Sequence, residues 1–247
     1  MHDTIQSKRV ALVTGGARGI GRAISLELAK NGFCVVVNYE RSEQAAVDLL
    51  DEIVRSGGQA HMFRADVADW NAVSRMFQSI TEDFGRLDVL VNNAGVLHES
   101  LFALTKLEDF WTILNTNLGG VVNCSKIAIP LLMRERKGRI INIASIAAMH
   151  CSVGLSAYAT SKAAIIALSK VLARELAPSG VTVNVVAPGL VDTEMARNRR
   201  NGTVRSQPIP RMGTPEEIAA VVTFLATEAP AYLTGEVIKV DGGAAIG

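Results

Sequence analysis

Several features are scarce in this sequence, and each scarcity excludes a class of protein. The 25 lysines and arginines balance the 24 aspartates and glutamates, so the formal net charge is only +1. A bulk charge of that size gives no reason to expect nucleic acid or an anionic membrane surface as a partner. Only three cysteines occur, Cys34, Cys124 and Cys151, an odd number without metal-ligand spacing. They are therefore expected to be reduced thiols of a cytoplasmic protein, each a small core residue.

Long apolar runs are also missing. The segment Met1–Arg9 is polar and lacks the apolar stretch of a signal peptide. The longest apolar region, Val121–Met133, is interrupted by Asn123, Lys126 and Pro130. Such a region is too short and too polar to span a bilayer, so no membrane partner is expected.

Short apolar runs, by contrast, alternate with longer helical stretches along the whole chain. Hydrophobic residues make up 49% of the 247 residues and charged residues 20%, a balance that supports one large buried core. Most of the short runs are apolar throughout, as is typical of parallel strands that helices cover on both faces. The predicted strands are Val10–Thr14, Cys34–Asn38, Ala60–Arg64, Val89–Asn92, Ile140–Ala144, Val181–Val186 and Val237–Val240. We therefore expect residues 1–247 to form a single α/β domain, a doubly wound, seven-stranded parallel sheet of the Rossmann type.

Amphipathic stretches between these runs predict helices, for example over Ala45–Arg55. Two helix starts are marked by the spacing of a capping box, Thr105 with Glu108 and Thr214 with Glu217. Each threonine is expected to accept a hydrogen bond from the backbone of the first helical turn.

Glycines dominate the turn after the first predicted strand. Gly15, Gly19 and Gly21 precede the helical stretch Arg22–Asn31. Glycines at such a strand-to-helix turn let the backbone approach a pyrophosphate, which the free amides of the helix start then bind. A P-loop is excluded because no Lys-Ser or Lys-Thr pair follows the glycines. The turn predicts a dinucleotide site, although its glycines do not have the G-x-G-x-x-G spacing.

The end of the second predicted strand bears on the choice of dinucleotide. An acidic residue there would bind the adenosine ribose hydroxyls and repel a 2′-phosphate, but this chain has Asn38. Arg18 and Arg41 are available to pair with a phosphate, which favours NADPH over NADH. Glu40 leaves the alternative open, since it could turn inward, bind the ribose and favour NADH.

Tyr158 and Lys162 are four residues apart in a predicted helix, so they lie on one face, one turn from each other. A free phenol has a pKa near 10, but an ammonium about 5 Å away at an effective dielectric near 20 favours the phenolate by roughly 3 kcal/mol. That corresponds to about two pKa units and brings the phenol toward the range of proton transfer. The same spacing is also common on exposed helix surfaces, so the pair alone does not establish a site.

Further polar residues end predicted strands at the edge where open α/β sheets bind ligands. Ser145 follows the strand Ile140–Ala144, the run Asn92–Gly95 ends the fourth strand, and Pro188-Gly189 leaves the sixth. Asn117 lies in the helical stretch between the fourth and fifth strands. These positions place polar groups around the Tyr158 helix.

The motifs together resemble those of the short-chain dehydrogenase/reductase family, and the match runs the full length of the chain. They are Thr14–Gly21, Asn92–Gly95, Asn117, Ser145, Tyr158-x-x-x-Lys162 and Pro188-Gly189. Within the family the chain is most similar to the β-ketoacyl-(acyl-carrier-protein) reductases.

The resemblance implies a catalytic tetrad of Asn117, Ser145, Tyr158 and Lys162. Tyr158 would give its proton to the substrate carbonyl oxygen while hydride arrives from the nicotinamide. Ser145 would hydrogen-bond that oxygen, Lys162 would bind the nicotinamide ribose and lower the pKa of Tyr158, and Asn117 would hold a water that links Lys162 to solvent.

The resemblance also implies a set of contacts with NADPH. Asp66 would contact the adenine edge, Asn93 would border the adenosine ribose and Thr193 would contact the nicotinamide amide. The full expected set is Gly15, Ala17, Arg18, Gly19, Ile20, Gly21, Asn38, Tyr39, Arg41, Ser42, Asp66, Val67, Asn93, Ala94, Gly95, Tyr158, Lys162, Pro188, Gly189, Val191 and Thr193.

The expected reaction is NADPH-dependent reduction of a 3-oxoacyl thioester on an acyl carrier protein, in fatty-acid, polyketide or polyene synthesis. Residues 190–212 should form a lid over the substrate. Its five arginines either belong to a mobile, solvated loop or meet a phosphopantetheine or an acidic carrier. They are Arg197, Arg199, Arg200, Arg205 and Arg211. Arg136 and Arg174 fall where the resemblance places carrier-docking arginines, and the family also implies a homotetramer or dimer.

Two alternatives remain open from the sequence. The same class of enzyme could act on a free ketone, a sugar, a steroid or an acyl-CoA such as acetoacetyl-CoA. A nucleotide-binding regulator without turnover is a third possibility, which the intact tetrad disfavours. His61, His98 and His150 have no mutual spacing for a metal, so no metal site is expected.

Overall fold

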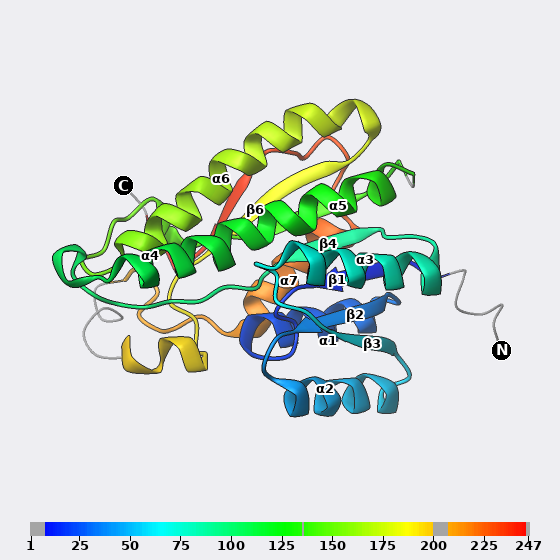
Figure 1. Cartoon of the computed structure of the whole chain (residues 1–247), viewed down its shortest axis with the longest axis horizontal. Helices are drawn as coiled ribbons and strands as arrows, with labels where there is room; N and C mark the ends of the chain where they lie inside the picture. The colour runs from blue at the N-terminus through cyan, green and yellow to red at the C-terminus, as the bar shows by residue number, and fades with distance from the viewer. Residues whose placement is uncertain (1–7, 135, 200–206, 246–247) are drawn as a thin grey trace.

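The computed structural model describes residues 8–134, 136–199 and 207–245, and it has one central parallel sheet of seven strands (Figure 1). The strands lie in the order β3-β2-β1-β4-β5-β6-β7, and all neighbours are parallel. The order reverses direction between β1 and β4, which is the switch point of a doubly wound sheet. The predicted fold class is thereby confirmed.

The strands begin and end within two residues of the predicted runs. They are β1 Val10–Val13, β2 Cys34–Tyr39, β3 Gln59–Arg64, β4 Val89–Asn92, β5 Arg139–Ile143, β6 Thr182–Pro188 and β7 Val237–Val240. The strands β1, β2, β4 and β6 are buried at every position, which explains why their sequences are largely apolar. The edge strand β3 has exposed residues, among them His61, Met62 and Arg64.

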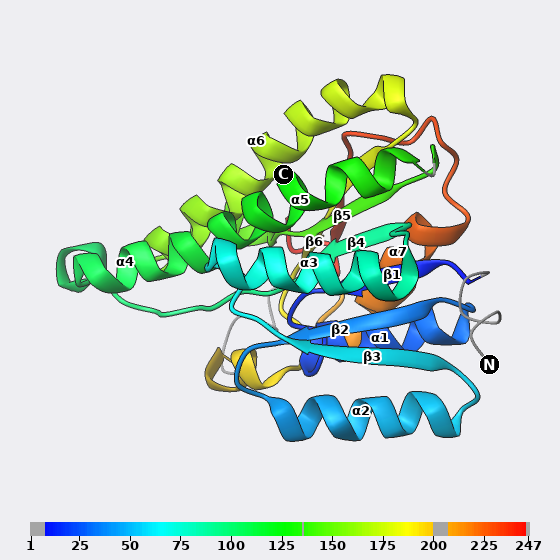
Figure 2. The ribbon, with the colours of Figure 1, turned by 45° about the vertical axis from the view of Figure 1, so that its right-hand side comes forward.

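Helices cover both faces of the sheet (Figures 1 and 2). The helices that do so are α1 Gly19–Lys30, α2 Glu43–Arg55, α3 Trp70–Phe84, α5 Gly120–Arg134, α6 Ser156–Leu176 and α7 Pro215–Thr227, whereas α4 Leu107–Leu114 packs against α6. One core cluster joins α1, α2 and α7 to the sheet, and a second joins α3, α5 and α6 to its other face. Among the described helices, none is long and apolar enough to cross a membrane.

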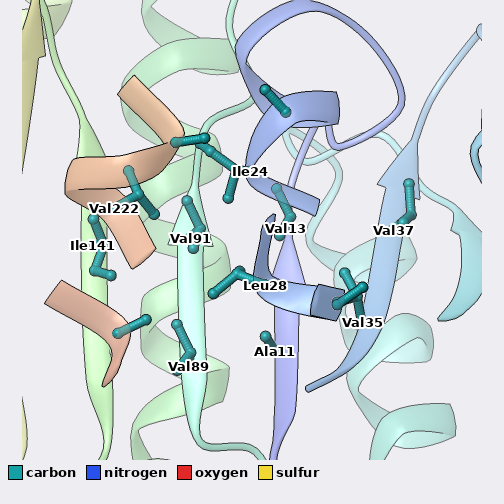
Figure 3. Packing of buried hydrophobic residues seen from close by; sticks show 14 of the residues in the cluster. Ala11, Val13, Ile24, Leu28, Val35, Val37, Val89, Val91, Ile141 and Val222 are labelled. Carbon is teal, nitrogen blue, oxygen red and sulfur yellow. The ribbon is translucent and has the colours of Figure 1, made fainter. Parts of the chain in front are cut away.

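Alternate residues of each central strand enter the two clusters. On the face in Figure 3, Val13 and Val91 lie beside Ile24 of α1, Val37 follows on the next strand, and Val222 of α7 lies over Ile141 and Val91. Leu12, Val36 and Leu90 point to the opposite cluster. This two-sided burial positions the loops at the carboxyl ends of the strands, where the candidate site lies.

The two predicted capping boxes differ in outcome. The box of Thr214 and Glu217 is confirmed, with both reciprocal hydrogen bonds at the start of α7. The box of Thr105 and Glu108 is wrong, because α4 begins after Lys106. The Thr105 hydroxyl instead donates to the Leu101 carbonyl oxygen at 3.0 Å and closes the turn before the helix.

The cysteine prediction also holds only in part. Cys34 and Cys124 are buried and Cys151 is exposed, all three as free thiols. Cys151 lies in the loop between Ser145 and α6, so it is not a core residue.

Candidate active site

The glycine-rich turn after β1 is fixed by polar side chains from two neighbouring strands. The Thr14 hydroxyl accepts the backbone amide protons of Asn93 and Ala94, each at 3.0 Å, and the side-chain Nδ2 of Asn93 donates to the carbonyl oxygens of Thr14 and Gly15. From β2, the side-chain Oδ1 of Asn38 accepts the backbone amide proton of Gly15 at 3.2 Å. Asn38 and Asn93 thus shape the backbone of the turn.

The third glycine of the motif is required by close packing. A Cβ atom on Gly21 would lie 2.2 Å from the Gly15 carbonyl oxygen and 2.5 Å from the Asn93 amide nitrogen. Any other residue would push the start of α1 away from the turn. The sequence motif therefore encodes the contact between helix and turn as well as access for a ligand.

The start of α1 faces a hollow, and the free amides of the helix start have the features of an anion site. In the part of the chain that the structure describes, no side chain caps α1, whose N-cap is Arg18. The first amides of a helix left in this way favour a negative group. The hollow has a volume of about 560 Å³ and is lined by Ala17, Arg18, Gly19, Arg22, Ala45, Asp48, Asp192, Thr193 and Glu194.

Both arginines predicted to bind a 2′-phosphate are exposed and paired with glutamates. Arg18 lies 3.2 Å from Glu194, and Arg41 lies 2.8 Å from Glu40. Glu194 belongs to the short helix Glu194–Arg199, drawn in gold beside the ends of α1 and α2 in Figures 1 and 2. A phosphate that binds here must therefore compete with a carboxylate for Arg18.

Lys162 is the most deeply buried charged group of the site, with 4% of its surface exposed. Its ammonium donates to the Ile143 carbonyl oxygen at the end of β5, at 2.8 Å, and lies 5.6 Å from the centre of the Tyr158 ring. Burial disfavours the charged form and lowers the pKa of Lys162 from 10.5 to about 8. The predicted proximity of the tyrosine and the lysine is present in the structure.

Asn117 lies in a π-helical turn, Asn115–Gly119, between α4 and α5. Such turns are frequent at functional sites because they redirect backbone groups. The side chain is fully buried, and both of its polar atoms bind the backbone of Val96, at 2.8 Å and 3.1 Å. A Cβ atom on Gly95 would lie 3.1 Å from the Asn117 carbonyl oxygen and 3.6 Å from the Lys162 ammonium. Asn117 and Lys162 therefore meet at Gly95.

Ser145 is two residues beyond β5 and starts the short turn Ile146–Ala148. Its hydroxyl oxygen accepts the Ala147 amide proton at 3.1 Å, which fixes the side chain at the carboxyl edge of the sheet. Tyr158, in the first turn of α6, is partly exposed. The four predicted catalytic residues thus come from the π-helical turn, the end of β5 and the start of α6.

The predicted cofactor residues are gathered at one edge of the sheet. They follow the carboxyl ends of β1, β2, β3, β4 and β6, because parallel strands all end on the same side. Asp66 and Val67 follow β3, where the Asp66 carboxylate accepts the Ala68 amide proton at 2.9 Å. Thr193 lies over the glycine turn, with its methyl 3.4 Å from where a Gly19 Cβ would be.

The predicted carrier-docking residues are not part of this cluster. Arg174 is 16 residues after Tyr158 on α6, which is about 24 Å along the helix axis. Arg136 follows the last residue of α5, and its carbonyl oxygen would lie 2.5 Å from a Cβ on Gly180. Both arginines are exposed and lie toward the amino ends of the strands.

Of the predicted lid, the structure describes residues 190–199 and 207–212. Residues Leu190 and Asp192 pair with Gly213, and the Arg211 guanidinium makes two hydrogen bonds to Glu217. Arg200 and Arg205 lie outside the described residues, as do the side chains of Arg197 and Arg199. In the described stem, Arg211 is thus paired within the chain.

Sequence reasoning missed a buried polar chain under the site. The Asn92 amide nitrogen donates to Ser125 at 3.1 Å and to Asn142 at 2.8 Å, and the Asn142 amide nitrogen donates to Ser169 at 2.8 Å. All four side chains are buried. The sequence did hold a signal for this chain of hydrogen bonds, because Asn92 and Asn142 each interrupt an otherwise apolar strand. A buried side-chain amide needs polar partners from neighbouring elements.

Comparisons with known proteins agree with this geometry. A family model described as short chain dehydrogenase matches residues 9–203. A 3-oxoacyl-(acyl-carrier-protein) reductase of Synechocystis sp. is 44% identical over 97% of this chain and 98% of its own length. Relatives of the same name from Staphylococcus aureus and Thermotoga maritima are 40% and 36% identical, over 94% and 96% of this chain and 96% and 98% of their own lengths.

Proposed function

The chain belongs to the short chain dehydrogenase family, and on that premise we propose that it is an NADPH-dependent reductase that converts a 3-oxoacyl thioester on an acyl carrier protein into the 3-hydroxyacyl thioester. The observation that carries the proposal is the meeting of Asn117 and the buried Lys162 at Gly95, one helical turn from Tyr158. Relatives named for this reaction match nearly the whole chain, which supports the choice of substrate.

The proposed chemistry is a proton transfer organised by four side chains. The Tyr158 hydroxyl donates its proton to the substrate carbonyl oxygen, and the Ser145 hydroxyl donates a hydrogen bond to the same oxygen. Negative charge that develops on this oxygen is thereby stabilised by two donors. Lys162, in its charged form, favours the Tyr158 phenolate that remains, and the Asn117 region connects Lys162 to solvent so that the proton is replaced.

The glycine-rich edge fits a nicotinamide dinucleotide. The uncapped start of α1, the hollow beside it and the packing at Gly21 together suit a pyrophosphate held by backbone amides. Asp66 and Val67 would border the adenine and Thr193 the nicotinamide end. When bound, the cofactor would supply the hydride for the carbonyl carbon.

NADPH is the proposed form of the cofactor because two arginines stand at the adenosine end. Arg18 and Arg41 pair with Glu194 and Glu40 in exposed positions, where an ion pair contributes little. A dianionic phosphate accepts several charge-assisted hydrogen bonds and competes well against a single carboxylate. The engagement of Glu40 with Arg41 also weakens the alternative in which Glu40 binds the ribose.

Exposed apolar side chains support self-association into a dimer or homotetramer. Leu107 and Trp111 of α4, Val122 and Met133 of α5 and Val171 of α6 are all exposed. An interface between subunits would cover such side chains. Sedimentation velocity of the native protein and of Trp111→Glu would test the proposal, with a lower mass expected for the variant.

The decisive experiment follows NADPH oxidation with three substrates in parallel: acetoacetyl-carrier protein, acetoacetyl-CoA and simple ketones. The proposal expects the highest kcat/KM with the carrier-bound substrate. Equal or better turnover of free ketones would replace it with a reductase of small ketones. No turnover with any substrate, together with tight NADPH binding, would favour a nucleotide-binding regulator.

A further inference from the structure

Two serines lie on the buried face of α6 in closely matching environments. Ser161 and Ser169 are two helical turns apart, and neither has any exposed surface. Each hydroxyl donates to a carbonyl oxygen of its own helix and accepts a hydrogen bond from an asparagine of a neighbouring element. The difference between them is which asparagine they hold.

Ser161 joins the helix that carries Tyr158 to the π-helical turn. Its hydroxyl accepts a hydrogen bond from the Asn117 amide nitrogen at 3.0 Å and donates to the Tyr158 carbonyl oxygen at 2.7 Å. Because Asn117 also binds Val96 on both polar atoms, a continuous chain of hydrogen bonds runs from Val96 to the backbone of Tyr158. This chain crosses the site between the loop after β4 and the first turn of α6.

We propose that Ser161 is a positioning residue of the reductase: its hydroxyl holds Asn117 in register with Tyr158 and Lys162, so that the proton relay of the proposed function is aligned. The inference rests on that proposed function, since it gives Ser161 a task only if Asn117, Tyr158 and Lys162 move protons. Ser161 does not reach the reacting atoms itself and acts through Asn117.

Burial makes this link stiff. An amide in a fully buried position retains its partners because water cannot replace them, so Asn117 has few alternative orientations while Ser161 is present. Without the serine hydroxyl, Asn117 keeps its two bonds to Val96 but loses its only described bond to α6. The π-helical turn is then held against α6 by packing without this hydrogen bond, and in catalysis a displacement of about 1 Å can cost about 100-fold in rate.

Ser169 provides the matched control within the same helix. Its hydroxyl donates to the Ile165 carbonyl oxygen at 2.6 Å and accepts from the Asn142 amide nitrogen at 2.8 Å. Asn142 belongs to β5 and is not one of the proposed catalytic residues. Removal of either hydroxyl should therefore cost similar stability, whereas only one of them should affect catalysis.

The test compares Ser161→Ala with Ser169→Ala in Tm, in NADPH affinity by fluorescence titration and in steady-state kinetics with acetoacetyl-CoA. We expect a similar fall in Tm for both, and a kcat that is about tenfold lower only for Ser161→Ala, which corresponds to loss of one buried hydrogen bond. KM and the Kd for NADPH should stay within about twofold, because Ser161 touches neither ligand. Ser161→Thr, which keeps a hydroxyl, should recover part of the lost kcat.

Equal kcat losses in the two alanine variants, or a native kcat in Ser161→Ala, would overturn the inference and leave Ser161 a structural residue. If Ser161→Ala does not fold, Ser161→Cys replaces it, since a thiol of similar size is only a weak hydrogen-bonding partner. The native protein separates the two proposals: no turnover of any ketone would overturn the function and the inference together, whereas native turnover with equal losses would overturn the inference alone.

Discussion

The two ends of the candidate site are built in opposite ways. At the reacting end, Lys162 and Asn117 are buried and bind backbone groups and a buried hydroxyl. At the adenosine end, Arg18 and Glu194 keep 63% and 61% of their side-chain surface exposed and bind each other. One end is held by groups that cannot be exchanged for water, and the other by an ion pair that solvent and ligands can replace.

This difference in burial suggests two tasks: the buried end fixes the geometry of the reacting groups, and the exposed end selects the cofactor. A buried hydrogen bond keeps its alignment because a lost partner leaves an unsatisfied group, whereas an exposed ion pair is screened and contributes little. Substitutions at the reacting end are therefore expected to change rates strongly. Substitutions at the adenosine end should change which cofactor binds, with smaller effects.

The largest effect is expected for Tyr158→Phe, which removes the proposed proton donor and leaves the packing of α6 intact. Turnover should fall by about 10³-fold or more, at the upper range of general acid catalysis. The Kd for NADPH, measured by fluorescence titration, should change by less than about twofold. Residual activity within about tenfold of the native protein would mean that another group donates the proton.

The burial of Lys162 should appear in the pH dependence of stability. Its pKa is lowered to about 8 in the folded protein, from 10.5. Between these two values the unfolded chain holds a proton that the folded chain has lost, so the free energy of unfolding rises with pH in this window. The rise should total about 3 kcal/mol from pH 8 to 10.5, and it should be absent in Lys162→Met.

Denaturant unfolding of the native protein, Lys162→Met and Lys170→Met at several pH values measures this rise in the free energy of unfolding. Lys170→Met is the control, because Lys170 is an exposed lysine of the same helix. The contributions of other titrating groups to the pH dependence cancel when each variant is compared with the native protein. Parallel curves for Lys162→Met and Lys170→Met would show that the lysine of the site is not desolvated.

The cofactor preference should respond to the exposed pairs. Arg18→Ala and Arg41→Ala should each lower the ratio of NADPH to NADH affinity by about tenfold, the loss of one charge-assisted hydrogen bond. Glu194→Gln should raise NADPH affinity by about twofold, because the competing carboxylate is removed from Arg18. Affinities come from fluorescence titration at two salt concentrations. A native protein that binds NADH more tightly would instead assign control of this pocket to Glu40.

The contrast between the two ends also explains what the sequence could predict. The apolar runs gave each strand to within two residues, because strands covered on both faces admit little else. Once the strands are parallel, residues after their carboxyl ends must meet, so Ser145 and Gly95 were expected near Lys162. Strand ends and helical spacing therefore placed these residues at one edge of the sheet, whereas the tetrad that includes Asn117 was implied by the resemblance to the family.

Contacts that depend on the path of a loop could not be predicted. Arg18 and Glu194 are 176 positions apart, and their pairing depends on where the chain after β6 passes. Asn38 marks the right strand end, but its buried amide binds the glycine turn and is not free to face a phosphate. The Thr105 hydroxyl is a local example. The capping-box spacing predicted that it binds the backbone of the following helix, but it binds the Leu101 carbonyl oxygen of the preceding turn.

A modest effect, on KM alone, is expected where a surface acts at a distance from the chemistry. Arg136→Glu should raise KM for acetoacetyl-carrier protein about fivefold by opposing an acidic partner, and leave kcat and the kinetics with acetoacetyl-CoA unchanged. Arg174 on the same surface is about 24 Å along α6 from Tyr158, so a charge there cannot reach the reacting atoms.

Arg55→Glu on α2, which packs on the other face of the sheet, makes the same change of charge and is the control. If both variants weaken the carrier substrate equally, net charge rather than a docking surface guides the carrier. If Arg136→Glu lowers the turnover of acetoacetyl-carrier protein and of acetoacetyl-CoA alike, the residue matters for folding. The carrier must then bind nearer to the exposed end of the site, at Arg18 and Glu194.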